Sequence, residues 1–275
     1  MIELETQKYS LAEEPLKRVS INTLFARAVI EKKVSGKVFV DDNTKPKTFY
    51  VIHPYGMSLL FGEATNESFN KQFLDYCLNK TGERAAVEWM QACPDTWDET
   101  LRRLFGNKLV SFSDNKEVPQ ELIELDTRVN FRFNREKYQA FKTNNVKKAY
   151  SIIRTNKDCY NQMRGSVVPA HFWDSAEDFC QNGVGFSLFC GDKLATTAYS
   201  AFIFDKELEL GMETVPEYRG KGFALHACSA LIDYCLLNNY EPIWACKLTN
   251  TPSYKLAQKL GFVPGCTLPY YRLAL

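Results

Sequence analysis

One short segment, Thr214–Ala224, combines residue types suited to binding a phosphate. It leads from a predicted strand, Glu207–Thr214, into a long predicted helix, Lys221–Leu237. Backbone N–H groups at the start of a helix have no partner within the helix and attract anions. Gly222 and Ala224 leave that backbone accessible. The segment lacks the Gly-Lys-Ser/Thr of a Walker loop and the third glycine of a dinucleotide fingerprint, so a different phosphate or pyrophosphate site is predicted.

The nine cysteines and three histidines predict neither a metal site nor covalent catalysis. No CxxC pair occurs, and most cysteines stand among apolar residues, as buried thiols of a reducing compartment do. His53 and His226 stand alone in the sequence and fit packed positions better than metal ligands. We therefore expect no metal. We also expect no acyl-cysteine step, because no thiol has an obvious histidine base beside it.

The C-terminal half alternates strands with helices around the candidate phosphate segment. The predicted elements are strands at Gly185–Cys190, Leu194–Phe204 and Glu207–Thr214, a helix at Lys221–Leu237, a strand at Ile243–Cys246, a helix at Thr251–Leu260 and a strand at Tyr270–Leu275. The first of these helices is apolar on nearly every side, which predicts that it is buried. Such alternation is typical of an α/β sheet with helices on its faces.

The N-terminal half repeats this order of elements. Its predicted elements are strands at Lys37–Val40, Thr48–Ile52 and Met57–Phe61, a helix at Asn66–Leu78, a strand at Ala85–Met90 and a helix at Trp97–Phe105. Within the first long helix of each half, Phe73–Leu78 (Phe-Leu-Asp-Tyr-Cys-Leu) matches Leu231–Leu236 (Leu-Ile-Asp-Tyr-Cys-Leu). We interpret the match as a degenerate duplication, and we predict two domains, residues 1–140 and 141–275.

Charge and composition exclude several classes of protein. The chain has 275 residues, of which 34 are Lys or Arg and 33 are Asp or Glu, giving a net charge of +1. A general nucleic-acid binder needs a clear cationic excess. No apolar run reaches the roughly 18–20 residues of a membrane span, and Met1–Pro15 has no apolar signal-peptide core. We expect a cytoplasmic globular protein that binds neither nucleic acid nor membrane.

Two motifs in the C-terminal half resemble those of the GNAT N-acetyltransferase superfamily. The first is Arg-x-x-Gly-x-Ala, and it is similar to the acyl-CoA signature of that superfamily. The second is Asn-x-x-Ser followed by Leu-Ala-Gln-Lys-Leu-Gly-Phe. The residues concerned are Arg219, Gly222, Ala224, Asn250, Ser253 and Leu256–Phe262. The resemblance covers about residues 146–275 and is nearest to a less-studied GNAT-like subgroup with an extra N-terminal region.

This resemblance implies an α/β (α+β layered) fold, in which a C-terminal GNAT-type mixed sheet flanked by helices follows a degenerate GNAT-like half. It implies acetyl-CoA as the co-substrate. The backbone of Thr214 and Val215 would pair with the pantetheine arm, and Asn250 and Ser253 would contact the cofactor or shape its pocket. The residues whose amides would hold the pyrophosphate are Arg219, Gly220, Lys221, Gly222, Phe223 and Ala224.

The N-terminal half lacks this signature. After Met57–Phe61 the sequence continues with Gly62–Ser68, which carries two carboxylates, Glu63 and Glu67, and no glycine at the matching loop position. Carboxylates would repel a pyrophosphate. We therefore expect this half to bind no CoA, and to cover the active site or help bind the acceptor.

The catalytic acid and base are less clearly marked. Many relatives carry a tyrosine as general acid where this chain has Ala257, and Tyr254, one helical turn earlier, could replace it only in a different geometry. Glu213 is the predicted base because it stands at the cofactor end of its strand, whereas Glu207 and Glu209 lie further away. The alternative is that Glu213 only orders the loop by accepting backbone N–H bonds.

We expect the acceptor to lie near His171 and Trp173, where family members place acceptor-site loops. The expected reaction is transfer of an acetyl group from acetyl-CoA to an amine by direct attack in a ternary complex. Two alternatives are a catalytically silent acyl-CoA-binding or regulatory module, suggested by Ala257, and an unrelated phosphate-binding protein. The acceptor could be a small-molecule or peptide amine, and a homodimer remains open.

Overall fold

The computed structural model describes residues 1–112, 119, 121–142 and 150–275, which form two compact units. Unit 1 comprises Met1–Val129, Lys247–Thr249 and Cys266–Leu275, and unit 2 comprises Asn130–Cys246 and Asn250–Gly265. Two long strands, β7 (Ile123–Phe133) and β14 (Phe262–Leu273), supply residues to both units. Each unit therefore draws on more than one stretch of the chain. The division into domains 1–140 and 141–275, which concerns a duplication, stays a prediction.

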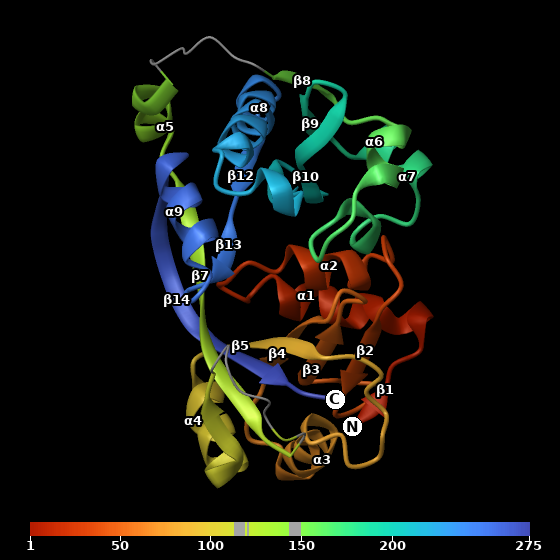
Figure 1. The fold of residues 1–275 in the computed structure, drawn as a ribbon. Helices are drawn as coiled ribbons and strands as arrows, with labels where there is room; N and C mark the ends of the chain where they lie inside the picture. The colour runs from red at the N-terminus through yellow and green to blue at the C-terminus, as the bar shows by residue number, and fades with distance from the viewer. Residues whose placement is uncertain (113–118, 120, 143–149) are drawn as a thin grey trace. The chain divides into compact units, whose positions relative to one another are not determined.

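Unit 1 is built on a sheet in which neighbouring strands follow the order β1-β2-β3-β4-β5-β14. Its other strands and helices are β1 (Ile2–Glu3), α1 (Glu13–Leu16), α2 (Leu24–Ile30), β2 (Lys37–Val40), β3 (Thr48–Ile52), β4 (Met57–Gly62), α3 (Glu67–Cys77), β5 (Glu88–Cys93), α4 (Thr96–Phe105) and β6 (Leu109–Ser111). Helices α3 and α4 cover one face of this sheet, and α1 and α2 lie over the other (Figure 1). Strands β4 and β5 are parallel and stay paired from Met57–Trp89 to Phe61–Cys93.

A buried carboxylate lies within the core of unit 1. Glu88 accepts hydrogen bonds from the hydroxyls of Tyr50 and Tyr76, and burial raises its pKa. Arg84, also buried, donates from Nη1 to the carbonyl oxygen of Leu273 at 2.9 Å. Since buried polar groups need hydrogen-bond partners, the Arg84 contact ties the segment before β5 to the end of β14, the strand that pairs with β5.

Unit 2 contains a second sheet, with strand order β12-β11-β10-β9-β8. Its elements are α5 (Arg135–Lys142), β8 (Ser151–Arg154), α6 (Lys157–Gln162), α7 (Ala176–Asn182), β9 (Gly185–Cys190), β10 (Lys193–Phe204), β11 (Glu207–Thr214), α8 (Phe223–Leu237), β12 (Glu241–Ile243), β13 (Ala245–Lys247, its last residue in unit 1) and α9 (Thr251–Lys259). Figure 1 shows α8 lying along this sheet, where it packs against β9, β10 and β11.

Helix α8 is held by one apolar stripe. Its fully buried residues are Ala227, Cys228, Leu231, Ile232 and Cys235. Burial raises the pKa of both Cys228 and Cys235 to about 12. Cys77, which stands at the matching place of the repeated Asp-Tyr-Cys-Leu segment in α3, is buried as well. The repeated sequence therefore has the same role in both helices, which is to pack against a sheet.

The structure corrects two predicted strands. The strand predicted at Ile243–Cys246 is divided, because β12 pairs with β11 whereas β13 pairs with β7. The last strand begins at Phe262 instead of Tyr270. Its first part contains Pro264 and Gly265, which disfavour a strand in sequence patterns. Both residues are exposed, so the sequence of that part resembles a loop.

Candidate functional site

Two neighbouring strands of unit 2 separate where the candidate site lies. Strands β11 and β12 are parallel, and their register runs from Glu207–Glu241 to Glu209–Ile243. The next residue of that chain segment, Trp244, accepts a hydrogen bond from the backbone N–H of Phe131 in β7 at 3.0 Å. The remainder of β11, up to Thr214, continues beyond its pairing with β12. The change of partner at Trp244 therefore leaves one edge of β11 open.

The direction of the backbone N–H and C=O groups along this open edge follows from their alternation along the strand. Val215 N–H donates to the carbonyl oxygen of Ala195 in β10 at 3.0 Å. In an antiparallel pair, alternate residues point their N–H and C=O groups away from the partner strand. The N–H and C=O of Met212 and Thr214 therefore face away from β10. Among the described residues, Met212 lies beyond the pairing of β11 with β12, so its groups are available to a ligand.

Helix α8 begins without a side-chain cap. Its N-cap residue, Gly222, has φ +78°, and a Cβ atom there would meet nothing within 4 Å. Within the part of the chain that the structure describes, the N–H groups from Gly220 to Ala224 have no protein acceptor. Leu225 N–H is the next in order and bonds to the Gly222 carbonyl oxygen at 3.1 Å. The start of α8 is thus an open group of amides with a partial positive charge.

Two cationic side chains flank these amides. The Nζ of Lys221 lies 5.0 Å from the centre of the Tyr218 ring. The side chain of Arg219 is 62% exposed and pairs with Glu213 at 3.3 Å. Its Nε donates to the Thr214 carbonyl oxygen at 3.1 Å. Thr214 N–H in turn donates to the Glu213 carboxylate at 3.2 Å. Both backbone groups that the sequence assigns to Thr214 for ligand pairing are therefore occupied by side chains.

Helix α9 supports the point where the chain changes partner strand. Asn250 caps the helix by accepting from Ser253 N–H at 3.2 Å, and Ser253 Oγ accepts from the indole N–H of Trp244 at 3.3 Å. The ring of Tyr254 lies edge-on to Phe131, with 5.2 Å between ring centres. Asn250 and Ser253 therefore hold Trp244 and α9 together and shape the open edge.

The acceptor-side residues predicted from the sequence have structural contacts of their own. Trp173 Nε1 donates to the Ser200 carbonyl oxygen at 2.8 Å, so its indole is held against β10. His171 is exposed, and its Nδ1 lies 3.2 Å from the Ser166 carbonyl oxygen. The N–H of Ser166 donates to Glu213 at 3.0 Å. The structure thus brings His171 and Glu213 to one loop, whereas Trp173 packs into the sheet.

Two parts of the site escaped the sequence analysis. Met212 could have been found by counting alternate residues along β11, although only the structure shows that the strand lacks a partner there. The segment Gly165–Val167 meets Glu213 from more than forty residues away along the chain, and no short motif marks such a contact.

Comparisons with known proteins agree with this geometry. Residues 14–271 match the family described as GNAT acetyltransferase. The chain belongs to the GNAT acetyltransferase family. This GNAT protein is 25% identical over 240 residues, 86% of its own length and 85% of the relative's, to the uncharacterized N-acetyltransferase YdfB of Bacillus subtilis. The family assignment confirms the resemblance drawn from the two motifs.

Solved structures share the fold over nearly the whole chain. A GCN5-related N-acetyltransferase-like protein from Streptococcus suis is 17% identical, with a TM-score of 0.69 and coverage of 96% of this chain and 98% of the other. A tandem GNAT protein from the clavulanic acid biosynthesis pathway is 9% identical, with a TM-score of 0.63 and coverage of 98% and 97%. These likenesses confirm the mixed α/β fold of this GNAT protein.

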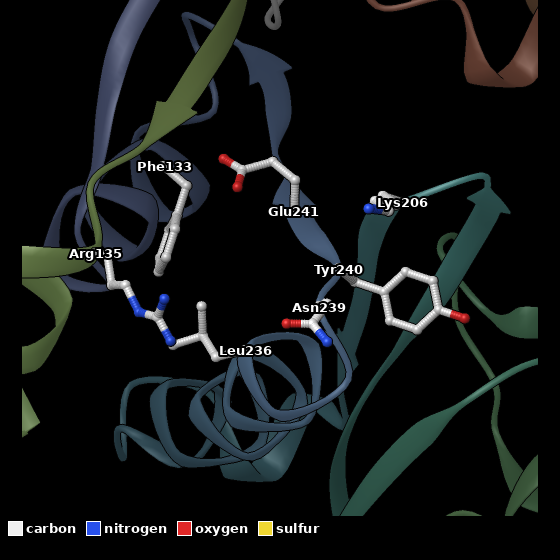
Figure 2. A pocket seen from close by; sticks show the side chains of 7 residues that line it. All are labelled: Phe133, Arg135, Lys206, Leu236, Asn239, Tyr240 and Glu241. Carbon is white, nitrogen blue, oxygen red and sulfur yellow. The ribbon is translucent and has the colours of Figure 1, made fainter.

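A hollow of about 360 Å³ lies elsewhere in unit 2. Figure 2 shows the side chains around it, which come from the end of β7, the start of α5, the β10–β11 turn, the end of α8 and the segment that follows α8. Its lining residues are Phe133, Arg135, Lys206, Leu236, Asn239, Tyr240 and Glu241. Leu236 is thirteen residues after Phe223 in α8, or roughly 20 Å along the helix. The hollow is therefore separate from the open amides of this GNAT protein.

Among the described residues, no group of three or more His, Cys, Asp or Glu side chains is placed to hold a metal ion. Over the same residues, no helix has the length and apolar character to span a membrane.

Proposed function

We propose that the chain is an N-acetyltransferase that moves the acetyl group of acetyl-CoA to an amine by direct attack in a ternary complex. The observation that carries the proposal is that an unpaired strand edge and an uncapped helix start lie close together in the sequence of unit 2. Strand β11 has an unpaired edge at Met212, and the uncapped start of α8 follows a few residues later. The first fits an extended amide-bearing arm, and the second fits a pyrophosphate.

The start of α8 fits the phosphates of acetyl-CoA. The amides from Gly220 to Ala224 supply donors, and no atom of the described residues lies within 4 Å of a Cβ placed at Gly222. Arg219 and Lys221 add positive charge beside them. Charge-assisted hydrogen bonds to phosphate are stronger than neutral ones, so this segment would supply most of the cofactor affinity.

The open edge of β11 fits the pantetheine arm. The N–H and C=O of Met212 would pair with its amides as a neighbouring strand would. Of the two residues that the sequence assigns to this pairing, Val215 donates its N–H to Ala195 of β10 and so faces away from the open edge. Thr214 extends that edge, and it becomes available only when Glu213 releases its N–H and Arg219 its carbonyl oxygen. Asn250 and Ser253 contribute by holding Trp244, which keeps β12 from following β11.

Bound acetyl-CoA supplies a thioester carbonyl that a neutral amine can attack. An amine with a pKa near 10 is mostly protonated at neutral pH and must lose a proton first. The sequence leaves two roles open for Glu213, proton acceptor or organiser of the loop. Its carboxylate accepts four hydrogen bonds, which favours the second role. The proton then passes to solvent water.

The departing thiol needs little help from this chain. The position that carries a tyrosine in many relatives is Ala257, which is fully buried. Tyr254 is the nearest phenol in α9, and among the described residues its hydroxyl has no hydrogen-bond partner. A thiol of pKa about 8.5 leaves as thiolate without a strong acid. Tyr254 is therefore proposed as an assisting acid, whose loss should slow transfer without abolishing it.

We propose a small-molecule or peptide amine as acceptor, which would approach beside His171. Because His171 bonds to the same loop that Glu213 holds, it is the better candidate of the two predicted contacts. The nine free cysteines support a reducing compartment such as the cytoplasm.

A second function is an acyl-CoA-binding module without turnover, which Ala257 favours. Calorimetry with acetyl-CoA, followed by mass spectrometry of products from a panel of amines, separates the two. Binding together with acetylated product supports the transferase. Binding without product for any amine supports the silent module, and absence of binding refutes both.

A further inference from the structure

The carboxylate of Glu213 is the meeting point of two loops. Its Oε2 accepts the backbone N–H groups of Ser166 at 3.0 Å and Val167 at 3.1 Å. Its Oε1 accepts Thr214 N–H at 3.2 Å and Arg219 Nη2 at 3.3 Å. The side chain is only 11% exposed. Since an ionised carboxylate offers about four acceptor positions, these four donors leave little capacity for an incoming proton.

A glycine allows the first of these loops to approach. Gly165 has φ +146°, and a Cβ atom at that position would lie 2.4 Å from Glu213 Oε2. Any side chain there would push the loop away from the carboxylate. The loop extends the contact further, because the Ser166 carbonyl oxygen lies 3.2 Å from Nδ1 of His171.

The second loop is the one that precedes α8. Arg219 belongs to the acyl-CoA motif, yet its guanidinium bonds to Glu213 and to the Thr214 carbonyl oxygen. One carboxylate therefore connects the segment that carries the open amides with the segment that carries His171. We call Glu213, Arg219 and Gly165–Val167 the clasp.

We propose that Glu213 is a positioning residue, which fixes the acceptor-side loop against the cofactor strand through this clasp. The inference rests on the proposed function, in which His171 lies beside the acceptor. The carboxylate has this role because, among the described residues, it is the one group that accepts N–H bonds from both loops. Loss of the clasp should loosen the acceptor side while the amides at the start of α8 stay in place.

Hydrogen exchange of the free protein tests the clasp directly. In Glu213→Gln the side chain has one acceptor oxygen, and its NH₂ group would face backbone donors. Exchange at the amides of Ser166 and Val167 should rise about 10–100-fold, as expected for the loss of a hydrogen bond to a charged group. Gly165→Ala should raise the exchange similarly, because its Cβ atom would push the loop away while residue 213 keeps its carboxylate. Glu207→Gln, an exposed carboxylate on the same strand, should leave it unchanged.

Kinetics then separate positioning from proton transfer. For a positioning residue, Glu213→Gln should raise the KM for the amine about tenfold or more, leave acetyl-CoA affinity nearly unchanged, and keep the shape of the pH profile of kcat. A general base predicts instead a loss of about 10²–10⁴ in kcat with the ascending limb of the pH profile removed.

Two results would overturn the proposal. One is unchanged exchange at Ser166 and Val167 in both Glu213→Gln and Gly165→Ala. The other is the pattern of kinetics expected for a base. The exchange experiment needs neither cofactor nor turnover, so its result does not depend on the proposed function. The proposed function fails separately if the native protein does not bind acetyl-CoA in calorimetry.

Discussion

Strands β4 and β5 of unit 1 and strands β11 and β12 of unit 2 have the same order and direction but different pairing. The first pair stays in register over five residue pairs, up to Phe61–Cys93. The second has three, ending at Glu209–Ile243. In unit 1 these two strands stay paired along β4, whereas in unit 2 the described residues leave one edge of β11 unpaired beyond Glu209. Binding capacity thus depends on where a strand stops pairing.

The helices that follow β4 and β11 also differ in whether a side chain caps the backbone amides at the helix start. Asn66 caps α3, and its Oδ1 accepts from Phe69 N–H at 3.1 Å, with Glu67 in the first turn. Helix α8 begins at Gly222 and has no side-chain cap. The start of α3 has one amide capped by a side chain and a negative charge beside it, while the start of α8 has no side-chain cap among the described residues. This difference gives a physical reason to expect no CoA at α3.

The largest expected effect is loss of cofactor binding in Gly222→Val. At φ +78° a branched side chain is strained, and it would stand over the amides that hold the phosphates. Calorimetry should detect no acetyl-CoA binding while the circular dichroism spectrum stays native.

Gly82→Val in unit 1 is the matched control. Gly82 has φ +69°, and a Cβ atom there also meets nothing within 4 Å. It therefore carries the same backbone strain without a ligand nearby. Affinity retained in Gly222→Val, or lost equally in Gly82→Val, would show that the start of α8 is not the phosphate site.

The buried cysteines of α3 and α8 are a feature in which the two units should behave alike, because both helices should protect their thiols from alkylation. Burial raises the pKa of Cys228 and Cys235 from 9.0 to about 12, which lowers the thiolate fraction near neutral pH by about 10³. Cys77 is equally buried. Iodoacetamide should label Cys180 and Cys266 first, since both are exposed.

Peptide mapping by mass spectrometry reads this labelling, with urea-unfolded protein as the reference in which all thiols react. The same mapping after incubation with acetyl-CoA should find no acetylated cysteine. Rapid labelling of Cys228, or an acetyl-cysteine that forms and decays at the rate of turnover, would contradict the direct mechanism.

A smaller effect concerns the buried Glu88 of unit 1. Burial raises the pKa of its carboxyl above 4.5, so the folded protein binds this proton more tightly than the unfolded chain does. The free energy of unfolding should therefore fall as pH rises from about 4.5 to the folded pKa, and stay level above it. Glu88→Gln should lack this fall, because glutamine does not titrate.

Urea unfolding at a series of acidic pH values, in native protein and in Glu88→Gln, gives the difference between their free energies of unfolding at each pH. A difference curve between native and Glu88→Gln that is flat or rises with pH would contradict the assignment.

The smallest effect is at the cap of α3. Asn66→Ala removes the acceptor of Phe69 N–H and should cost about 1 kcal/mol of stability. Acetyl-CoA affinity should not change. Guanidinium unfolding measures the first and calorimetry the second, and an altered affinity would show that the start of α3 takes part in binding after all.

Local patterns were enough to predict the elements that surround the candidate site. The bounds of β11 were predicted exactly as Glu207–Thr214, since apolar residues alternate with glutamates between a tight turn and a proline. The apolar run predicts a helix at Lys221–Leu237, and α8 begins two residues later, at Phe223, with Gly222 as its N-cap. These elements depend on neighbours within a few residues, which a sequence displays.

The remaining features depend on contacts between distant segments. The break at Trp244 arises because β7 supplies a backbone donor from Phe131, and nothing near Trp244 in the sequence announces it. The role of Glu213 depends on Gly165–Val167 in the same way. The spacing of the carboxylates on β11 singled out Glu213 as the candidate base. It could not reveal that the Glu213 carboxylate already accepts four hydrogen bonds.

Strand β14 also has a consequence for the order in which the protein becomes complete during synthesis. Residues 271–273 pair with residues 88–90 of β5 in unit 1, and Arg84 bonds to the carbonyl oxygen of Leu273. A ribosome that has made residues 1–129 has therefore not yet made the strand that covers the edge of β5. That edge of β5 stays unpaired until residues 266–275 are synthesised. The sheet of unit 1, which is translated first, is therefore among the last parts of the protein to be completed.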